Sequence, residues 1–333
     1  MLTRNRCFAA CLAAALALVP AEALAWGYSG HRIINLVAMR QLPADVPSFL
    51  KDADAVAAVE DLGPEMDVLK GAGQSFDRDE DPGHYVDVGD DHRIAGMIAL
   101  DALPADMEAY EKALESAGTD PYRIGYLPYT IADGWEQLRK DFAYWRVFSY
   151  LSTRADGDRD RAAFVADQHL REMLIVRDIG VWGHFVGDGS QPLHVTVHFN
   201  DGGIHAPFEG EFVRNHVTVA AVSHLVPAGG PRAPEELISQ NGLLSDVGTY
   251  LAATNAQEPQ LYSIARQHGF AKATPEAVAF ATARVADGAR ELRDLIVLAW
   301  DNSLYASVGY PELRVSDILD DRVHPGPTAF GGD

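Results

Sequence analysis

Cysteine is almost absent from this chain of 333 residues, because Cys7 and Cys11 are the only two. Both lie within residues 1–25, where a basic start, an apolar stretch and an Ala-Leu-Ala cleavage pattern together indicate a secretory signal. Cleavage before Trp26 would leave a mature chain without cysteine. This excludes disulfides and thiolate ligands from the mature chain, so any metal site in it must be built from His, Asp and Glu.

Long hydrophobic runs and positive charge are also scarce. The apolar stretch within residues 1–25 is shorter than the roughly 20 residues that span a bilayer, so we expect no stable membrane anchor and a secreted or periplasmic location. Lys and Arg number 27 against 48 Asp and Glu, for a formal net charge of −21. Such a charge disfavours a passive nucleic-acid binder, although bound cations can reverse the local sign at a site. No segment of the sequence indicates a protein partner.

Strand-like alternation is rare, and its best example is the short segment 217–222. Apolar residues instead recur at helical spacing, in segments 31–41, 105–115, 135–152, 161–186, 233–253 and 276–298. No repeat or linker divides the chain, which is 47% hydrophobic and can bury a large core. We therefore predict an all-α, single-domain, multi-helix protein over 26–320, with a signal peptide at 1–25 and a Gly/Pro-rich tail at 321–333.

The most informative segment for function is GHFVGDGSQPLH at 183–194, which holds His184, Asp188 and His194. His and Asp four positions apart on a helix share one face, and a chain turned by Gly and Pro can return a third side chain beside them. A lone histidine at the end of an apolar helix is more often a hydrogen-bonded core residue. Three such groups in one segment instead favour a metal site.

Three other patterns are ambiguous by themselves. His205 and Glu209 lie four apart at a predicted helix start, but solvated pairs of this kind are common. His84 in the sequence HYVD is most simply a surface residue of a short strand or loop. The acidic run at 77–81 resembles a calcium loop, yet a proline stands where the turning glycine is required, so a solvated face explains it better.

The start of the mature chain is a fourth candidate. If cleavage occurs before Trp26, the new amine and the carbonyl oxygen of that residue can chelate a metal, with His31 closing the site from the next helical turn. An α-amine with a pKa of roughly 8 readily loses its proton to a divalent metal. The simpler interpretation is that Trp26 only begins the core.

Taken in order, WGYSGH at 26–31, HYVD at 84–87 and GHFVGDGSQPLH at 183–194 resemble motifs of the trinuclear zinc phosphodiesterase superfamily. This superfamily contains the single-strand-specific nucleases of fungi and plants and the zinc-dependent phospholipases C of bacteria. The matching motifs run from Trp26 to Glu209. The resemblance implies a phospholipase C/nuclease-type fold, with long metal-binding loops at 71–92 and 187–216.

The resemblance also implies a ligand set for three Zn²⁺ ions. These ligands are Asp67, His84 and His184 for one zinc, Trp26 and His31 for a second that Asp188 bridges to the first, and His194, His205 and Glu209 for the third. Asp67 is placed from the local string GPEMDVLKGAG, with Asp77 as the fallback. Glu209 in HAPFEGEFV is nearer the phospholipase pattern than the Asp of the fungal nucleases.

The implied chemistry is hydrolysis of a phosphodiester. Two zinc ions bridged by Asp188 can lower the pKa of a shared water from near 16 to roughly 7, and Asp67 can orient or deprotonate that water. The third zinc can hold a phosphate oxygen and stabilise charge on the leaving oxygen. On this interpretation the catalytic side chains are Asp67 and Asp188.

The choice of substrate depends on the pocket. The WGxxGH start is closer to the nucleases, in which Tyr85 would stack on a base and Asp87 would accept from the base edge. We therefore predict a zinc-dependent endonuclease that acts on single-stranded DNA, RNA or nucleotides and leaves 5′-phosphates, with 3′-nucleotidase activity left open. The alternatives are a zinc-dependent phospholipase C, in which the same aromatic ring flanks a choline or acylglycerol group, and a non-catalytic periplasmic zinc-binding protein.

Overall fold

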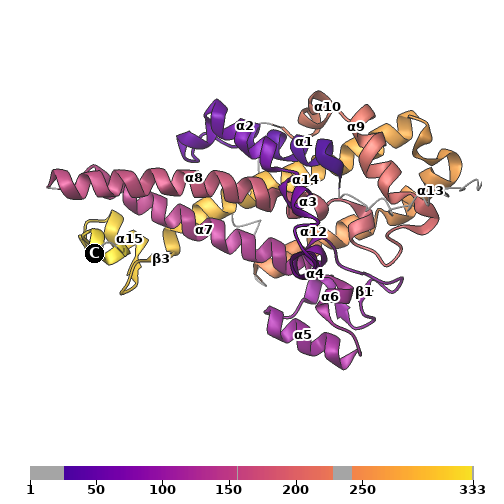
Figure 1. The fold of residues 1–333 in the computed structure, drawn as a ribbon, viewed down its shortest axis with the longest axis horizontal. Coiled ribbons are helices and arrows are strands. Elements are labelled where there is room, and N and C mark those ends of the chain that lie inside the picture. The colour runs from indigo at the N-terminus through magenta and orange to yellow at the C-terminus, as the bar shows by residue number, and fades with distance from the viewer. Residues whose placement is uncertain (1–25, 156, 228–241, 332–333) are drawn as a thin grey trace, which may run out of the picture.

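The computed structural model describes residues 26–155, 157–227 and 242–331, which are mainly helical (Figure 1). The central helices are α1 (Gly27–Arg40), α7 (Leu127–Ser152), α8 (Asp158–Asp188) and α14 (Pro275–Asn302). Helices α7 and α8 pack along each other, and their outer ends extend beyond the rest of the molecule (Figure 1). The predicted all-α fold is confirmed.

Local sequence explains where the longest C-terminal helix begins and why it stays in place. The side chain of Thr274 caps α14 by accepting a hydrogen bond from the Ala277 amide, and Pro275 occupies the first helical position. One face of the helix carries apolar side chains, such as Leu292 and Ile296, that are fully buried. Each such side chain contributes about 1.5–3 kcal/mol to stability through its burial. The helix thereby holds α1, α7 and α8 together.

Shorter elements complete the described chain. The helices are α2 (Ala53–Leu62), α3 (Glu65–Leu69), α4 (Gln74–Glu80), α5 (Met107–Ser116), α6 (Pro121–Ile124), α9 (Val213–His216), α10 (Val219–Leu225), α12 (Leu243–Asn255), α13 (Glu258–His268) and α15 (Val315–Leu319). The 3₁₀ turns are η1 (Ser48–Lys51), η2 (Asp81–His84), η3 (Leu100–Ala102), η4 (Pro192–His194), η5 (Asp201–Gly203), η7 (Gly269–Ala271), η8 (Ser303–Tyr305) and η9 (Pro327–Phe330), whereas η6 (Pro207–Phe212) is π-helical.

Strands in the described residues form two small antiparallel hairpins. Strand β1 (Arg93–Ile94) pairs with β2 (Ile98–Ala99), with Arg93 opposite Ala99. Strand β3 (Ser307–Val308) pairs with β4 (Leu313–Arg314), with Ser307 opposite Arg314. None of the helices in the described ranges is both long and apolar enough to cross a membrane.

The segment with the most strand-like alternation, 217–222, is not a strand in the structure. This segment enters helix α10, because the Thr218 hydroxyl accepts from the Ala221 amide and caps the helix start. The valines in the segment pack toward α14 rather than into a sheet, so tertiary contacts override their strand propensity. The predicted helix at 233–253 falls partly outside the described residues, and its described part begins α12 at Leu243.

The buried apolar residues form two clusters. The larger cluster joins α1, α7, α8, α12 and α14. The smaller one lies at the outer end of α7 and α8, where Phe148 and Phe164 contact the C-terminal segment through Val315 and Phe330. The predicted tail at 321–333 is therefore partly packed, since the ring of Phe330 is 5.1 Å from that of Phe148.

Candidate metal centre

Two helices approach closely where His31 of α1 faces the end of α8. A Cβ atom at Gly187 would lie 3.1 Å from Nδ1 of His31, and one at Gly183 would lie 2.3 Å from Oδ1 of Asn35. A side chain at position 183 would therefore force Asn35 to move, and one at 187 would press against His31. The Asn35 amide strengthens the contact by donating hydrogen bonds to the carbonyls of Val59 and Gly180.

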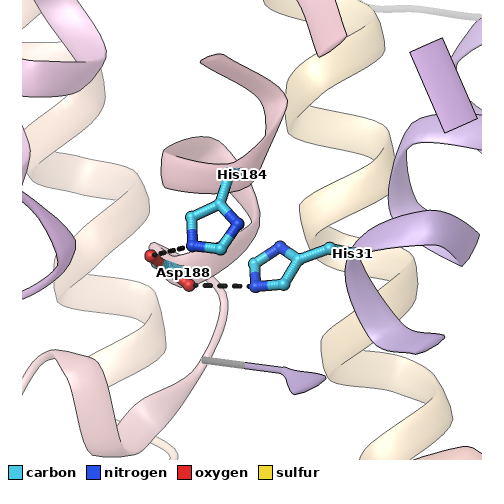
Figure 2. A group of neighbouring side chains, drawn as sticks. All are labelled: His31, His184 and Asp188. Carbon is cyan, nitrogen blue, oxygen red and sulfur yellow. Dashed lines mark ion pairs between the residues drawn. The ribbon is translucent and has the colours of Figure 1, made fainter. Parts of the chain in front are cut away.

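Figure 2 shows the first group of side chains, which comes from these two helices. His31 Nε2 lies 3.4 Å from Asp188 Oδ1, and His184 Nε2 lies 3.5 Å from Asp188 Oδ2. The two imidazole rings stack with their centroids 3.8 Å apart. All three side chains are fully buried, so their polar atoms face one another rather than water.

A second group shares His184 with the first and adds Asp67 from α3 and His84 from η2. Asp67 Oδ1 lies 3.8 Å from His184 Nε2, and His84 Nδ1 lies 3.0 Å from Asp188 Oδ2. One oxygen of Asp188 therefore faces His31 while the other faces His84 and His184. This is the position that a carboxylate bridging two cations must occupy.

The third group consists of His194 from η4 together with His205 and Glu209 around η6. Glu209 Oε2 lies 2.8 Å from His205 Nε2 and 3.8 Å from His194 Nε2. The Gln191 amide also donates to Glu209 Oε2 at 3.0 Å and helps to hold the carboxylate. Single π-helical turns of the kind seen in η6 are frequent at functional sites.

Backbone carbonyls hold two of the imidazoles in defined orientations. Nδ1 of His184 donates to the carbonyl of Gly63 at 2.8 Å, and Nδ1 of His194 donates to the carbonyl of His84 at 2.7 Å. A proton on Nδ1 leaves Nε2 as the lone-pair donor. In both residues Nε2 is the atom that faces the carboxylates. Metal-ligating histidines commonly have this arrangement, in which a hydrogen bond from the other ring nitrogen fixes the orientation of the ring.

The donor atoms fit divalent cations. In each of the three groups one ligand atom per residue lies within 4.8 Å of the others. Within the described residues, the buried atoms of these groups that make no hydrogen bond include Asp188 Oδ1, His194 Nε2 and Glu209 Oε1. Leaving buried polar atoms unpaired costs free energy that a bound cation would remove. Nitrogen and carboxylate oxygen ligands suit Zn²⁺.

Burial controls the protonation of these groups. Desolvation raises the pKa of Asp188 well above its ordinary value, and it raises the pKa of Asp67 despite the neighbouring ammonium of Lys70. Burial lowers the pKa of His184 to about 3 and that of His84 well below its ordinary value. Neutral imidazoles are ready to bind a metal, and a cation would favour the ionised carboxylates.

Trp26 begins α1 in the described chain and is fully buried. Its indole nitrogen donates to the Gly187 carbonyl at 2.8 Å and to Ser190 Oγ at 2.9 Å. Its carbonyl oxygen accepts the first hydrogen bond of the helix, from Gly30 at 3.2 Å. The tryptophan therefore does begin the core, and chelation by its amine and carbonyl stays a prediction. The predicted signal peptide at 1–25 lies outside the described residues.

The structure brings the predicted side-chain ligands together and separates Asp67 from its fallback. Asp67 is buried in the second group, whereas Asp77 lies on α4 and accepts a hydrogen bond from the Gly71 amide. His84 is also buried, so the simpler interpretation of this residue as a surface histidine is wrong. The calcium-like acidic run forms helix α4 and the start of η2 rather than a loop.

A cavity of about 410 Å³ opens beside the second and third groups. Its lining residues are Lys70, Asp81, His84, Tyr85, Asp87, Arg123, Leu193, His194, Phe199 and His205. Both predicted substrate residues, Tyr85 and Asp87, are therefore at this cavity. Burial raises the pKa of Asp87 to about 6.

The cavity residues that sequence reasoning did not assign to the site include Lys70, Arg123 and Phe199. Lys70 Nζ lies 2.9 Å from Asp67 Oδ1, and its place three residues after Asp67 is a signal that helical spacing could have revealed. Phe199 lies between His194 and His205 in the loop predicted to bind metal, so its position was also a signal, whereas Arg123 carries none because it reaches the cavity from a segment distant in sequence. The two cations supply positive charge beside the carboxylates of an acidic protein.

Comparisons with known proteins give little guidance. No family model matches the chain, and no curated protein matches it. Among solved structures, the chain is similar to the alpha toxin from Clostridium absonum, with 10% sequence identity and a TM-score of 0.42. The match covers 85% of this chain and 65% of the toxin chain, so it spans less than two thirds of that protein. The candidate site therefore rests on its own geometry.

Proposed function

We propose that this protein is a secreted or periplasmic zinc-dependent phosphodiesterase whose catalytic domain, over residues 26–320, cleaves single-stranded nucleic acid to 5′-phosphorylated products. One observation carries the proposal: the carboxylate of Asp188 lies between His31 and the pair His84 and His184. A third group, with Glu209, lines up beside the same cavity. This arrangement supports up to three Zn²⁺ around one substrate phosphate.

When bound, Zn²⁺ would acidify water at neutral pH and offset the negative charge of a phosphodiester. The protein residues would do the rest. Asp188 would hold the first two groups in register, and Asp67 would orient the attacking water and accept its proton. Lys70, which pairs with Asp67, would oppose the effect of burial on that carboxylate and attract a phosphate oxygen. Outer-shell carbonyls would fix the imidazoles, so little reorganisation is needed during reaction.

The size and lining of the cavity suit a nucleotide next to the phosphate that is cleaved. Its volume of about 410 Å³ falls within the range of small-molecule sites. Tyr85 supplies an aromatic face for a base, Asp87 supplies an acceptor for a base edge, and Arg123 supplies a cation for a phosphate. Base stacking on an aromatic side chain is available only when the strand is single.

Phospholipase C activity is the second candidate because of the residues near the third group. Glu209 is nearer the phospholipase pattern than the Asp of the fungal nucleases, and Phe199 is 53% exposed at the cavity. An apolar rim of this kind also suits an acyl chain or a lipid headgroup. A zinc-binding protein without turnover is the remaining alternative.

One experiment separates the three candidates. The mature protein, beginning at Trp26 and loaded with zinc, is incubated with single-stranded DNA, RNA and phosphatidylcholine vesicles, each with and without a chelator. We expect chelator-sensitive release of fragments or mononucleotides ending in 5′-phosphate. Chelator-sensitive release of diacylglycerol alone would refute the nuclease and support phospholipase C. Stoichiometric zinc without turnover of any substrate would support the binding protein.

A further inference from the structure

The loop between His194 and His205 brings an aromatic ring to the cavity. Phe199 lines the cavity, is 53% exposed, and lies with its ring centroid 6.4 Å from that of His205. An exposed phenylalanine gains no stability by pointing toward water. Its position beside a candidate ligand therefore suits contact with the apolar part of a substrate.

The neighbouring His198 lies between two carboxylates. Its Nδ1 is 2.8 Å from Asp201 Oδ2, and its Nε2 is 3.0 Å from Asp90 Oδ1. Ionised carboxylates only accept hydrogen bonds, and a neutral imidazole has a single N–H to donate. Both contacts can therefore form at once only when His198 is an imidazolium. The hydrogen bonds that His198 donates to the two carboxylates raise its pKa accordingly.

The two carboxylates belong to different segments of the cavity wall. Asp201 lies in η5, two residues after Phe199, whereas Asp90 lies three residues after Asp87. His198 thus ties the segment that carries Tyr85 and Asp87 to the loop that carries Phe199. The Val197 amide adds to this connection by donating to the carbonyl of Val88 at 3.0 Å.

Helix α13 supports the same loop from the other side. The hydroxyl of Tyr262 donates to the carbonyl of His198 and accepts from the Asp201 amide at 3.2 Å. Burial raises the pKa of Tyr262 to about 12, and Glu258 on the same helix adds to this shift, so the phenol stays neutral. The groups that face His198 are then Asp90, Asp201 and the neutral Tyr262.

We propose that Phe199 determines substrate specificity by stacking on the base beside the bound phosphate, and that imidazolium His198 is the positioning residue that holds it there. The identity of the ligand as a base rests on the proposed function. The contacts of His198 are present below its raised pKa and are lost as the pH rises through that value. Cavity selectivity therefore decreases on the alkaline side.

The first test measures binding to the zinc-loaded protein by calorimetry, with thymidine 5′-monophosphate, phosphocholine and inorganic phosphate as probes. Phe199→Ala should weaken thymidine monophosphate binding about tenfold, the scale of one stacking contact, and leave phosphate binding unchanged. An equal loss for both probes, or no wild-type binding of either organic probe, would overturn the proposal. If Phe199→Ala instead weakens only phosphocholine, the specificity role stands and the nuclease assignment is wrong.

The second test addresses His198 directly. His198→Gln should weaken nucleotide binding about two- to fivefold at pH 6, the scale of partly exposed ion pairs, whereas His198→Arg should retain it to higher pH than the wild type. His169→Gln, at an exposed histidine of α8, is the matched control and should change nothing. In ¹⁵N-histidine spectra both ring nitrogens of His198 should stay protonated above pH 6.5. Titration at its ordinary pKa, or the same alkaline loss in His198→Arg, would overturn the positioning role.

Discussion

The two ends of helix α8 perform different tasks. At its C-terminal end the helix has glycines at 183 and 187 and buries His184 and Asp188. At its N-terminal end it buries Phe164 against Phe148 and Phe330. Buried polar groups cost free energy unless they are paired, whereas buried aromatic groups stabilise directly. We therefore expect the structure around the C-terminal end of α8 to depend on bound metal and the packing around its N-terminal end to be independent of metal.

Removal of the bridging carboxylate should have the largest effect. We expect Asp188→Ala to lose two of three zinc ions and nearly all hydrolysis, because its two oxygens face different groups. Metal content and phosphodiester hydrolysis are measured together. Asp160→Ala, at an exposed carboxyl near the other end of α8, should behave as the wild type. Three zinc ions bound to Asp188→Ala would contradict the assignment.

An extra residue before Trp26 also tests the metal site at the C-terminal end of α8, because the amine of Trp26 is a predicted ligand there. If the amine of Trp26 chelates a metal, an added residue removes the ligand and one zinc ion, while the third group beside Glu209 keeps its metal. Zinc content is compared between proteins that begin at Trp26 and at an added alanine. Full zinc content and activity with the extension would count against the amine as a ligand.

Removal of an aromatic side chain near the N-terminal end of α8 should reduce stability without changing the zinc content. Phe148→Ala removes a ring that is 3% exposed and packs against Phe330 at 5.1 Å. We expect a loss of about 3–4 kcal/mol in the free energy of unfolding, typical of deleting a buried phenylalanine. Urea unfolding with and without chelator should show the same loss, and zinc content should be unchanged. A reduced zinc content would show that the two ends are coupled.

A single methyl group should distinguish the glycines of α8. A Cβ atom at Gly187 would lie 3.0 Å from Ile34 Cδ1 and 3.1 Å from His31 Nδ1, whereas one at Gly157 would meet nothing within 4 Å. Gly187→Ala should displace His31 and weaken zinc binding about tenfold, the lower scale for a disturbed ligand orientation. Gly157→Ala is the control. Equal zinc affinity in both variants would mean that the close approach of α1 and α8 is not needed for metal binding.

The smallest expected effect is the pH dependence at Asp87. Burial raises its folded pKa from 3.8 to about 6, so the native state holds this proton more tightly than the unfolded state. The associated stability is present at low pH and is lost as the pH rises through about 6. Asp87→Asn should therefore stabilise the protein at pH 7.5 by about 1 kcal/mol, after discounting for solvent screening. No gain relative to Asp160→Asn would contradict this.

Sequence patterns predicted the longest helices because their signal is local. Apolar spacing located α1, α5, α7, α8 and α14. The predicted bounds differ most at the start of α7, which begins at Leu127 rather than at 135. The strand-like segment at 217–222 forms the start of a helix, because valine spacing over six residues does not distinguish a strand from a helix that a threonine caps. The candidate ligands were identified only through a resemblance of separated motifs, since His84 and Glu209 were ambiguous by themselves.

By itself, the sequence determined the helical class and the absence of thiolate ligands from residues 26–333. It also determined the pairs His184 and Asp188 or His205 and Glu209, because residues four apart are neighbours within one or two turns of a helix. Only the tertiary structure decided that Asp67 rather than Asp77 joins His84, and that Lys70, Arg123 and Phe199 reach the same cavity. These contacts join segments far apart in the chain. Their distances are set by how closely α1, α7, α8 and α14 pack, and no local pattern contains that information.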